Sequence, residues 1–137
     1  MTPRIPAALR RLVIGRAQGR CEYCRLAQEG QEATFHVDHV VPRKATGDTA
    51  LRNLAFACVS CSLRKAARQT AVDPETGEDV PLFNPRQDTW SEHFQWQGVL
   101  LVGLTTTGRA TIEALQMNRP LILAIRHEEV QRGIRLL

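Results

Sequence analysis

Four cysteines of this 137-residue chain stand in two matched pairs, and their spacing predicts a metal site. Cys21 and Cys24 form the first pair, Cys58 and Cys61 form the second, and residues 25–57 lie between them. Two C-x-x-C pairs with no cysteine left over are typical of a tetrahedral four-cysteine zinc site. Such a zinc has no open coordination position, so we expect it to be structural and to tie together the two ends of the intervening segment.

Two disulfides, or four unrelated buried thiols, are the alternatives to the zinc site. Disulfides need an exported protein, and residues 1–15 lack the long apolar run and small-residue cleavage site of a signal peptide. No apolar stretch approaches the roughly 20 residues that span a bilayer. We therefore expect a cytoplasmic protein with no membrane partner.

Charge is distributed unevenly along the chain. Residues 1–70 hold twelve Lys and Arg against five Asp and Glu, a net charge of +7. Residues 71–137 hold six against nine, a net charge of −3. The basic half suggests an anionic partner, with nucleic acid as the leading candidate and an ordinary solvated basic surface as the alternative.

Several motifs fall together in the segment Phe35–Lys65, which reads FHVDHVVPRKATGDTALRNLAFACVSCSLRK. An Asp38-His39 pair ends a β-like run, Pro42 follows, Asn53 comes later, and the second cysteine pair leads into a basic helical segment. This combination resembles the core of the HNH nucleases, the ββα-metal family, in which a hairpin and a helix hold one cation against a phosphodiester.

The resemblance covers roughly residues 10–70 and implies a role for each matching residue. It makes His39 the general base, and a neutral imidazole can take a proton from water near pH 7. It makes Asp38 a ligand of a catalytic Mg²⁺ or Mn²⁺, which favour hard anionic oxygens. Asn53 matches the middle residue of the motif and would hold His39 in place; its alternative is to bridge backbone at a turn with no catalytic consequence.

Ser62 departs from the family pattern, which has His or Asn directly after the second cysteine pair as the other metal ligand. A hydroxyl is a weaker ligand than either, and three outcomes are open. Ser62 binds the cation weakly while waters complete the shell, or His36 on the Asp38 face substitutes for it. In the third outcome the protein binds DNA and no longer cuts it.

Hydrophobic and turn signals place these residues on local structure. The segment after Pro6 predicts a helix that ends at Gly19, with one apolar face. Residues 34–41 and 54–59 predict two strands of a hairpin, and a helix follows through position 68. Strict alternation points Asp38 and His39 in opposite directions, and the bend expected near Pro42 would bring both to one site. The apolar face of the first helix is formed by Ile5, Leu9, Leu12 and Val13. Ser60 or Ser62 is the candidate cap of the helix that follows the hairpin.

Basic residues around the motif are candidates for phosphate contacts, although each alone is more often a solvated surface charge. They are Arg43, Lys44, Arg64, Lys65 and Arg68. Glu92-His93 is a possible remote acid–base pair, with a packed, hydrogen-bonded histidine as the favoured interpretation, and His127 is expected to be structural.

Residues 71–137 look like a covering extension of mixed structure. Residues 73–78 (DPETGE) predict a turn, Gln97-Gly98 a hairpin, and Thr106 or Thr107 the cap of a helix through position 115. A final helix after Pro120 is expected to bury one stripe, formed by Leu123, His127, Val130, Ile134 and Leu137. This tail also resembles that of one group of small HNH proteins.

Together these signals predict an α+β fold: an HNH nuclease core in residues 1–70, held by a four-cysteine zinc, and an extension in residues 71–137 that packs on it. The expected function is a metal-dependent DNA endonuclease with water as nucleophile. The alternative is a zinc-stabilised nucleic-acid-binding module that has lost cleavage through Ser62, and a plain zinc-ribbon interaction module is more remote. The presence of Asp38, His39 and Asn53 favours the enzyme. Oligomeric state is not predicted.

Overall fold

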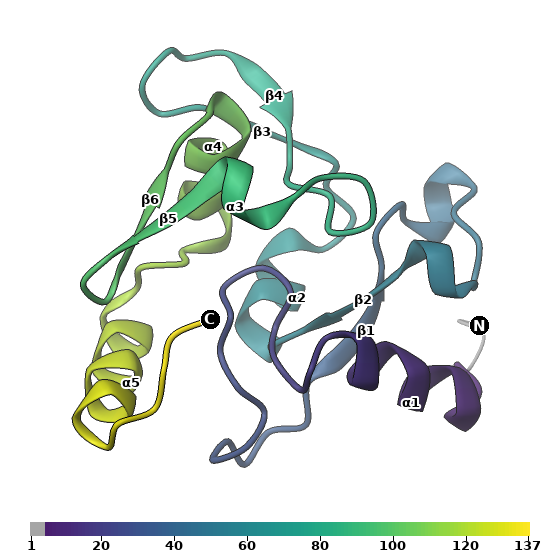
Figure 1. The fold of residues 1–137 in the computed structure, drawn as a ribbon. Helices are drawn as coiled ribbons and strands as arrows, with labels where there is room; N and C mark the ends of the chain where they lie inside the picture. Colours follow the sequence, from purple (N-terminus) through teal and green to yellow (C-terminus); the bar gives the residue numbers. More distant parts are fainter. Residues whose placement is uncertain (1–4) are drawn as a thin grey trace.

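The computed structural model describes residues 5–137, so the first four residues of the expected core lie outside it. Helices alternate with three separate two-stranded antiparallel sheets in this part of the chain, which confirms the α+β class (Figure 1). The elements in order are α1 (Ala7–Arg16), β1 (His36–His39), η1 (Arg43–Ala45), η2 (Leu51–Asn53), β2 (Leu54–Ala57), α2 (Val59–Lys65), β3 (Thr70–Val72), β4 (Asp79–Pro81), α3 (Trp90–His93), β5 (Phe94–Gln97), β6 (Leu100–Gly103), α4 (Thr106–Leu115) and α5 (Pro120–Gln131).

Helix α1 begins directly after Pro6, whose missing N–H costs nothing at a helix start. Its last turn leads through Gln18 and Gly19, both at positive φ, into the first cysteine pair. Val13 is fully buried, whereas Leu12, expected on the same face, is 59% exposed. The apolar face of α1 is therefore narrower than the sequence pattern predicted.

The β1–β2 hairpin and α2 form a ββα unit, with α2 lying against the hairpin (Figure 1). All four residues of β2 are buried, and α1 packs against this strand. The cap of α2 is Cys58, whose sulfur accepts from the N–H of Cys61, so the prediction of Ser60 or Ser62 as the cap was wrong. The helix ends at Lys65 because Ala66 has a positive φ, which leaves Arg68 beyond it.

The extension contains two hairpins packed on α4. The predicted turn joins β3 and β4, and the β5–β6 hairpin turns at Gly98. Thr105, one residue before the expected caps, accepts the N–H of Gly108 and caps α4. Gly108 has no room for a side chain, because a Cβ there would lie 2.2 Å from the carbonyl oxygen of His93. This contact brings the start of α4 close to the β5–β6 hairpin.

Helix α5 buries a different face from the predicted one. It ends at Gln131, and Val130, Ile134 and Leu137 are 49%, 42% and 48% exposed. Its buried residues are Ile122 and Arg126. His127, expected to be structural, is exposed and contacts Gln131. The spacing of apolar residues alone therefore selected the wrong stripe.

One hydrophobic cluster joins the two halves of the chain. Tyr23, between the first two cysteines, packs edge-on against Phe83. The indole N–H of Trp90 donates to the carbonyl oxygen of Tyr23 at 2.9 Å. Arg86, which is partly buried, forms an ion pair with Glu22, and Glu22 also accepts the N–H of Phe56 in β2. The extension thus contacts Glu22 and Tyr23, the two residues between the first cysteine pair.

Candidate functional site

The four cysteine sulfurs form one buried cluster that fits a metal ion. All four lie within 4.8 Å of one another, and the Cys24 and Cys58 sulfurs are 3.7 Å apart. A tetrahedral zinc with Zn–S bonds of about 2.3 Å requires S–S separations of about 3.8 Å, and the Cys24–Cys58 distance has this value. The four cysteines are thus positioned for a zinc-like ion, as the sequence predicted.

Burial of the cluster has an electrostatic consequence. Desolvation raises the pKa of the Cys21 thiol, because a lone thiolate is poorly stabilised away from water. Hydrogen bonds from the neighbouring thiols lower the pKa of Cys58. A cluster of this kind favours several thiolates together only when a cation balances their charge.

His36 and Asp38 lie on the face of β1 that is opposite the buried Val37. Both side chains are partly exposed. The Nδ1 atom of His36 is 2.7 Å from the Oγ atom of Ser62 on α2. The structure therefore brings Ser62 to the Asp38 face of the hairpin through a contact with His36.

The backbone bends directly after β1, as the sequence suggested. The N–H of Val40 still pairs with the carbonyl of Asn53 across the hairpin. The ammonium group of Lys65 donates to the carbonyl oxygens of His39, at 3.3 Å, and Val40, at 3.2 Å. Lys65 therefore bridges two backbone carbonyls at the point where the chain bends out of β1.

The side chain of His39 has one polar neighbour on a loop. Its Nε2 atom is 2.8 Å from the Oγ1 atom of Thr49, which also accepts from Arg43 at 2.9 Å. Partial burial and the nearby charge of Arg43 lower the pKa of His39, so the imidazole is neutral at pH 7. Within residues 5–137 the Nδ1 atom makes no hydrogen bond, so this ring nitrogen is open to a water molecule. A neutral ring with one free nitrogen suits a general base.

Asn53 organises the loop that follows His39. Its Oδ1 atom accepts the N–H of Val41 at 2.9 Å, and its Nδ2 atom donates to the carbonyls of Val41, at 3.0 Å, and Asp48, at 2.8 Å. Gly47 packs against the same segment, and only glycine has room there, because a Cβ would come within 1.8 Å of the carbonyl oxygen of Val41. These bonds use three of the four hydrogen-bonding positions of the amide. Asn53 thus holds the loop that carries Thr49.

The five basic residues expected at phosphates occupy different environments. Arg43, Lys44, Arg64 and Arg68 are exposed. Lys65 is only 3% exposed, and burial lowers its pKa. Its ammonium group is bonded to backbone carbonyls, so Lys65 has a structural contact where the sequence suggested a surface one.

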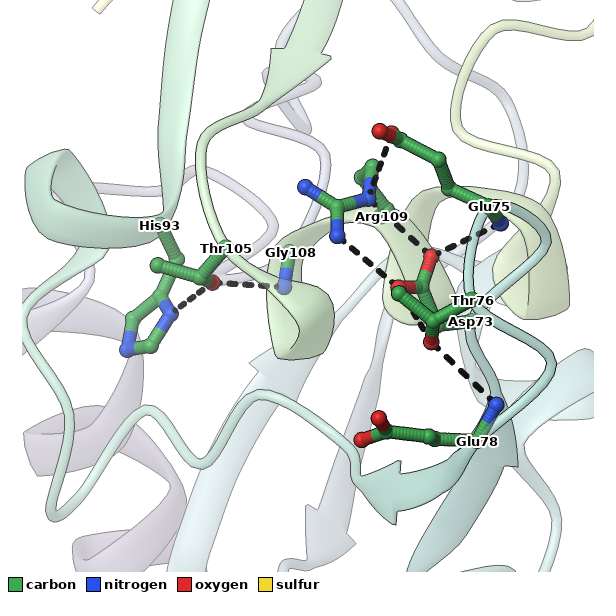
Figure 2. A network of polar contacts seen from close by, with 8 residues as sticks. All are labelled: Asp73, Glu75, Thr76, Glu78, His93, Thr105, Gly108 and Arg109. Carbon is green, nitrogen blue, oxygen red and sulfur yellow. Dashed lines mark hydrogen bonds and ion pairs between the residues drawn. The ribbon is translucent and has the colours of Figure 1, made fainter.

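A second polar network lies in the extension (Figure 2). Asp73 is fully buried and accepts two hydrogen bonds from Arg109, at 3.0 and 2.8 Å. Figure 2 also shows His93 directed at Thr105, with its Nδ1 atom 2.6 Å from the hydroxyl. His93 is therefore a packed, hydrogen-bonded histidine, which was the favoured interpretation, and Glu92 beside it is exposed.

Thr49 is the residue at this site that the sequence did not suggest. It lies ten positions after His39 in a loop, and no spacing rule connects a threonine there to the histidine. The only signal was the neighbouring Gly47 and Asp48, which predict a turn but no particular contact. Its contact with His39 depends on the fold of the loop, which Asn53 holds in place.

A β-hairpin and a helix framed by four cysteines positioned for a metal ion define a ββα module. The same segment, residues 21–68, matches the family model of the HNH endonucleases. This match and the relative described next support the prediction that the segment is a domain of the HNH endonuclease type.

The chain is also similar to the Septu protein PtuB of Bacillus thuringiensis. The two are 24% identical over 105 residues, which cover 75% of this chain. The chain spans only 38% of the length of that relative. No solved structure matches the chain. Within residues 5–137, every helix is too short or too polar to cross a membrane.

Proposed function

We propose that this protein is a metal-dependent DNA endonuclease that uses water as its nucleophile. The observation that carries the proposal is the environment of His39, beside Asp38 at the bend of the hairpin. One ring nitrogen of His39 contacts Thr49, the other is available, and its lowered pKa keeps the ring neutral. Within residues 5–137 the neighbouring Asp38 carboxylate makes no hydrogen bond or ion pair, which suits it to hold a cation beside this histidine.

In the proposed reaction, Nδ1 of His39 takes a proton from a water molecule as its oxygen attacks the phosphorus of a phosphodiester. The bond from phosphorus to the leaving sugar oxygen breaks, and that oxygen gains a proton from solvent. A divalent cation, Mg²⁺, Mn²⁺ or a similar ion held by Asp38, would neutralise charge on the phosphate and on the leaving oxygen. Asn53 would act indirectly, by holding the loop that positions His39.

Nucleic acid is the expected partner because the domain belongs to a nuclease family and the first half of the chain is basic. The four exposed cations around the site (Arg43, Lys44, Arg64 and Arg68) would contact backbone phosphates. We propose that residues 1–70 supply this chemistry. Residues 71–137 would support the first cysteine pair.

A second candidate is a zinc-stabilised DNA-binding module without cleavage. The observation that favours it is Ser62, which stands where the family places a His or Asn ligand. If no other residue supplies that ligand, the cation would rest on Asp38 and water alone, and the domain would bind DNA without cutting it.

Plasmid cleavage separates the two candidates. Zinc-loaded protein is incubated with supercoiled DNA and either no added metal, Mg²⁺, Mn²⁺ or Ni²⁺. We expect cleavage that needs an added cation, and a loss of about 10²–10⁴-fold in rate for His39→Ala. The matched control is His127→Ala, an exposed histidine on α5 that should cut normally.

Zinc content and DNA affinity are measured for each variant, so that misfolding is distinguished from lost chemistry. A His39→Ala protein that cuts at the wild-type rate contradicts the proposed base. A wild-type protein that binds DNA and is silent with every cation supports the binding module instead.

A further inference from the structure

The contact between His36 and Ser62 changes what each residue can do for a catalytic cation. Ser62 is buried, at 9% exposure, and its hydroxyl lies 2.7 Å from Nδ1 of His36. A serine hydroxyl is in any case a weak metal ligand. Ser62 is therefore better placed to orient His36 than to bind a cation itself.

His36 carries the features of a metal ligand. Its Nδ1 is occupied by Ser62, and within residues 5–137 its Nε2 atom makes no hydrogen bond. Histidines that bind metals typically donate one ring N–H to a neighbouring acceptor, which sets the tautomer and leaves the other nitrogen for the metal. An Nδ1–H donated to Oγ of Ser62 gives this tautomer.

Asp38 lies beside His36 on the same face of β1. Residues two apart in a strand point the same way and lie about 6.7 Å apart along it, so an imidazole and a carboxylate can reach one ion. In the described part of the chain, the Asp38 carboxylate accepts no hydrogen bond and forms no ion pair. A carboxylate oxygen and an imidazole nitrogen thus share this face of β1.

We propose that His36 and Asp38 are the two protein ligands of the catalytic cation, and that Ser62 positions His36. This proposal deepens the proposed function, since it rests on the use of a catalytic cation. The nitrogen ligand comes from the strand, and the helix supplies only its orienting partner. A mixed nitrogen and oxygen pair favours Mn²⁺ or Ni²⁺ over Mg²⁺, which prefers oxygen ligands alone.

Pulsed electron paramagnetic resonance with Mn²⁺ tests the ligand directly and needs no activity. Zinc-loaded protein is titrated with Mn²⁺, and the spectrum reports whether an imidazole nitrogen is bound to the ion. We expect a nitrogen signal in the wild type and in His39→Ala, and its loss in His36→Gln. Mn²⁺ affinity should fall about tenfold in Ser62→Ala, as is usual for loss of an orienting partner, and further in His36→Gln.

Ser62→His in the His36→Gln background provides a rescue. A histidine at position 62 would supply the ligand from α2, so nitrogen signal and Mn²⁺ affinity should return. Recovery in this double variant would show that weak binding in His36→Gln does not come from misfolding. The zinc content of each variant is measured as a further check on folding.

The outcomes separate this proposal from the proposed function. If His36→Gln keeps the nitrogen signal and the wild-type Mn²⁺ affinity, His36 is not a ligand, even if the protein cuts DNA through His39. If the signal depends on His36 but no cation supports cleavage, the ligand assignment stands and the endonuclease proposal fails. A wild type that binds Mn²⁺ without a nitrogen signal overturns the assignment.

Discussion

Replacing Arg126 by methionine tests whether the extension and the cysteine cluster unfold as one unit. Arg126 is 2% exposed on α5. Its guanidinium donates to the carbonyl oxygens of Met117 at 2.7 Å and Val99 at 3.0 Å, and to the side chain of Asn118 at 3.1 Å. A longer bond, at 3.4 Å, reaches the carbonyl of Cys24. Methionine keeps most of the apolar stem and removes every donor.

The expected cost of Arg126→Met is about 3 kcal/mol of unfolding free energy. Each of the three shorter bonds comes from a charged donor and contributes about 1.5–3 kcal/mol. Ordering the arginine offsets about 2 kcal/mol of this sum. Burial of the charge offsets more, and the same desolvation lowers the pKa of Arg126. The net loss is a large share of the roughly 5–15 kcal/mol typical of a domain.

Urea unfolding with two probes measures this effect. Fluorescence of Trp90 and Trp96 reports on the extension, and zinc release to a chromogenic chelator reports on the cysteine cluster. Both midpoints should fall together by about 1.5 M urea. The control is Arg132→Met, an exposed arginine paired with Glu128 at the end of the same helix, which should cost under about 0.5 kcal/mol. A fall in the fluorescence midpoint with unchanged zinc release would show two independent units and refute the reasoning.

Three further predictions concern other contacts. Thr49→Val should slow cleavage on the order of tenfold, which corresponds to the energy of about one hydrogen bond. Thr49→Ser should retain the rate, and both variants should bind DNA normally. Equal rates for Thr49→Val and wild type would exclude a role for the hydroxyl. Hydrogen bonds from Arg109 lower the pKa of Asp73, so the pair stabilises the fold at neutral pH and loses this contribution as the pH falls below the ordinary 3.8 toward the lower folded-state pKa. Thermal melts against pH should show a weaker acid dependence in Asp73→Asn but an unchanged one in the exposed control Glu75→Gln, and matching curves for Asp73→Asn and wild type would contradict this. Charge reversal at the exposed residues Arg43, Lys44, Arg64 and Arg68 should reduce the log–log salt slope of DNA binding by about 3.6, measured by fluorescence anisotropy. An unchanged slope would place the phosphate contacts elsewhere.

Spacing rules predicted the features of this protein that depend on residues near one another in sequence. The two cysteine pairs, the strand–strand–helix order and the turn of residues 73–78 follow from fixed offsets and from residues with special backbone preferences. Boundaries were less accurate. The first strand is His36–His39 where residues 34–41 were expected, because the bend held by Lys65 ends it early.

Contacts between distant residues could not be predicted in the same way. Lys65 was expected at a phosphate and Arg126 was given no role, yet both are buried because backbone carbonyls converge around them. Those carbonyls come from turns and strand ends whose positions depend on the whole fold. The contact of Ser62 with His36 could not be predicted either, since His36 lies 26 residues earlier in the chain.

Helix α2 would link the zinc expected at the cysteine cluster to the proposed reaction, although that zinc has no open coordination position for substrate. Cys61 faces the sulfur cluster, Ser62 faces His36, and Lys65 reaches the backbone at His39. Positions 61, 62 and 65 share one face of a helix, because residues three and four apart lie one above the other. The helix has only seven residues, too few to be stable alone, and its cap is itself a member of the cluster, Cys58. The cluster therefore sets the position of α2, and α2 sets the positions of both histidines proposed for the reaction.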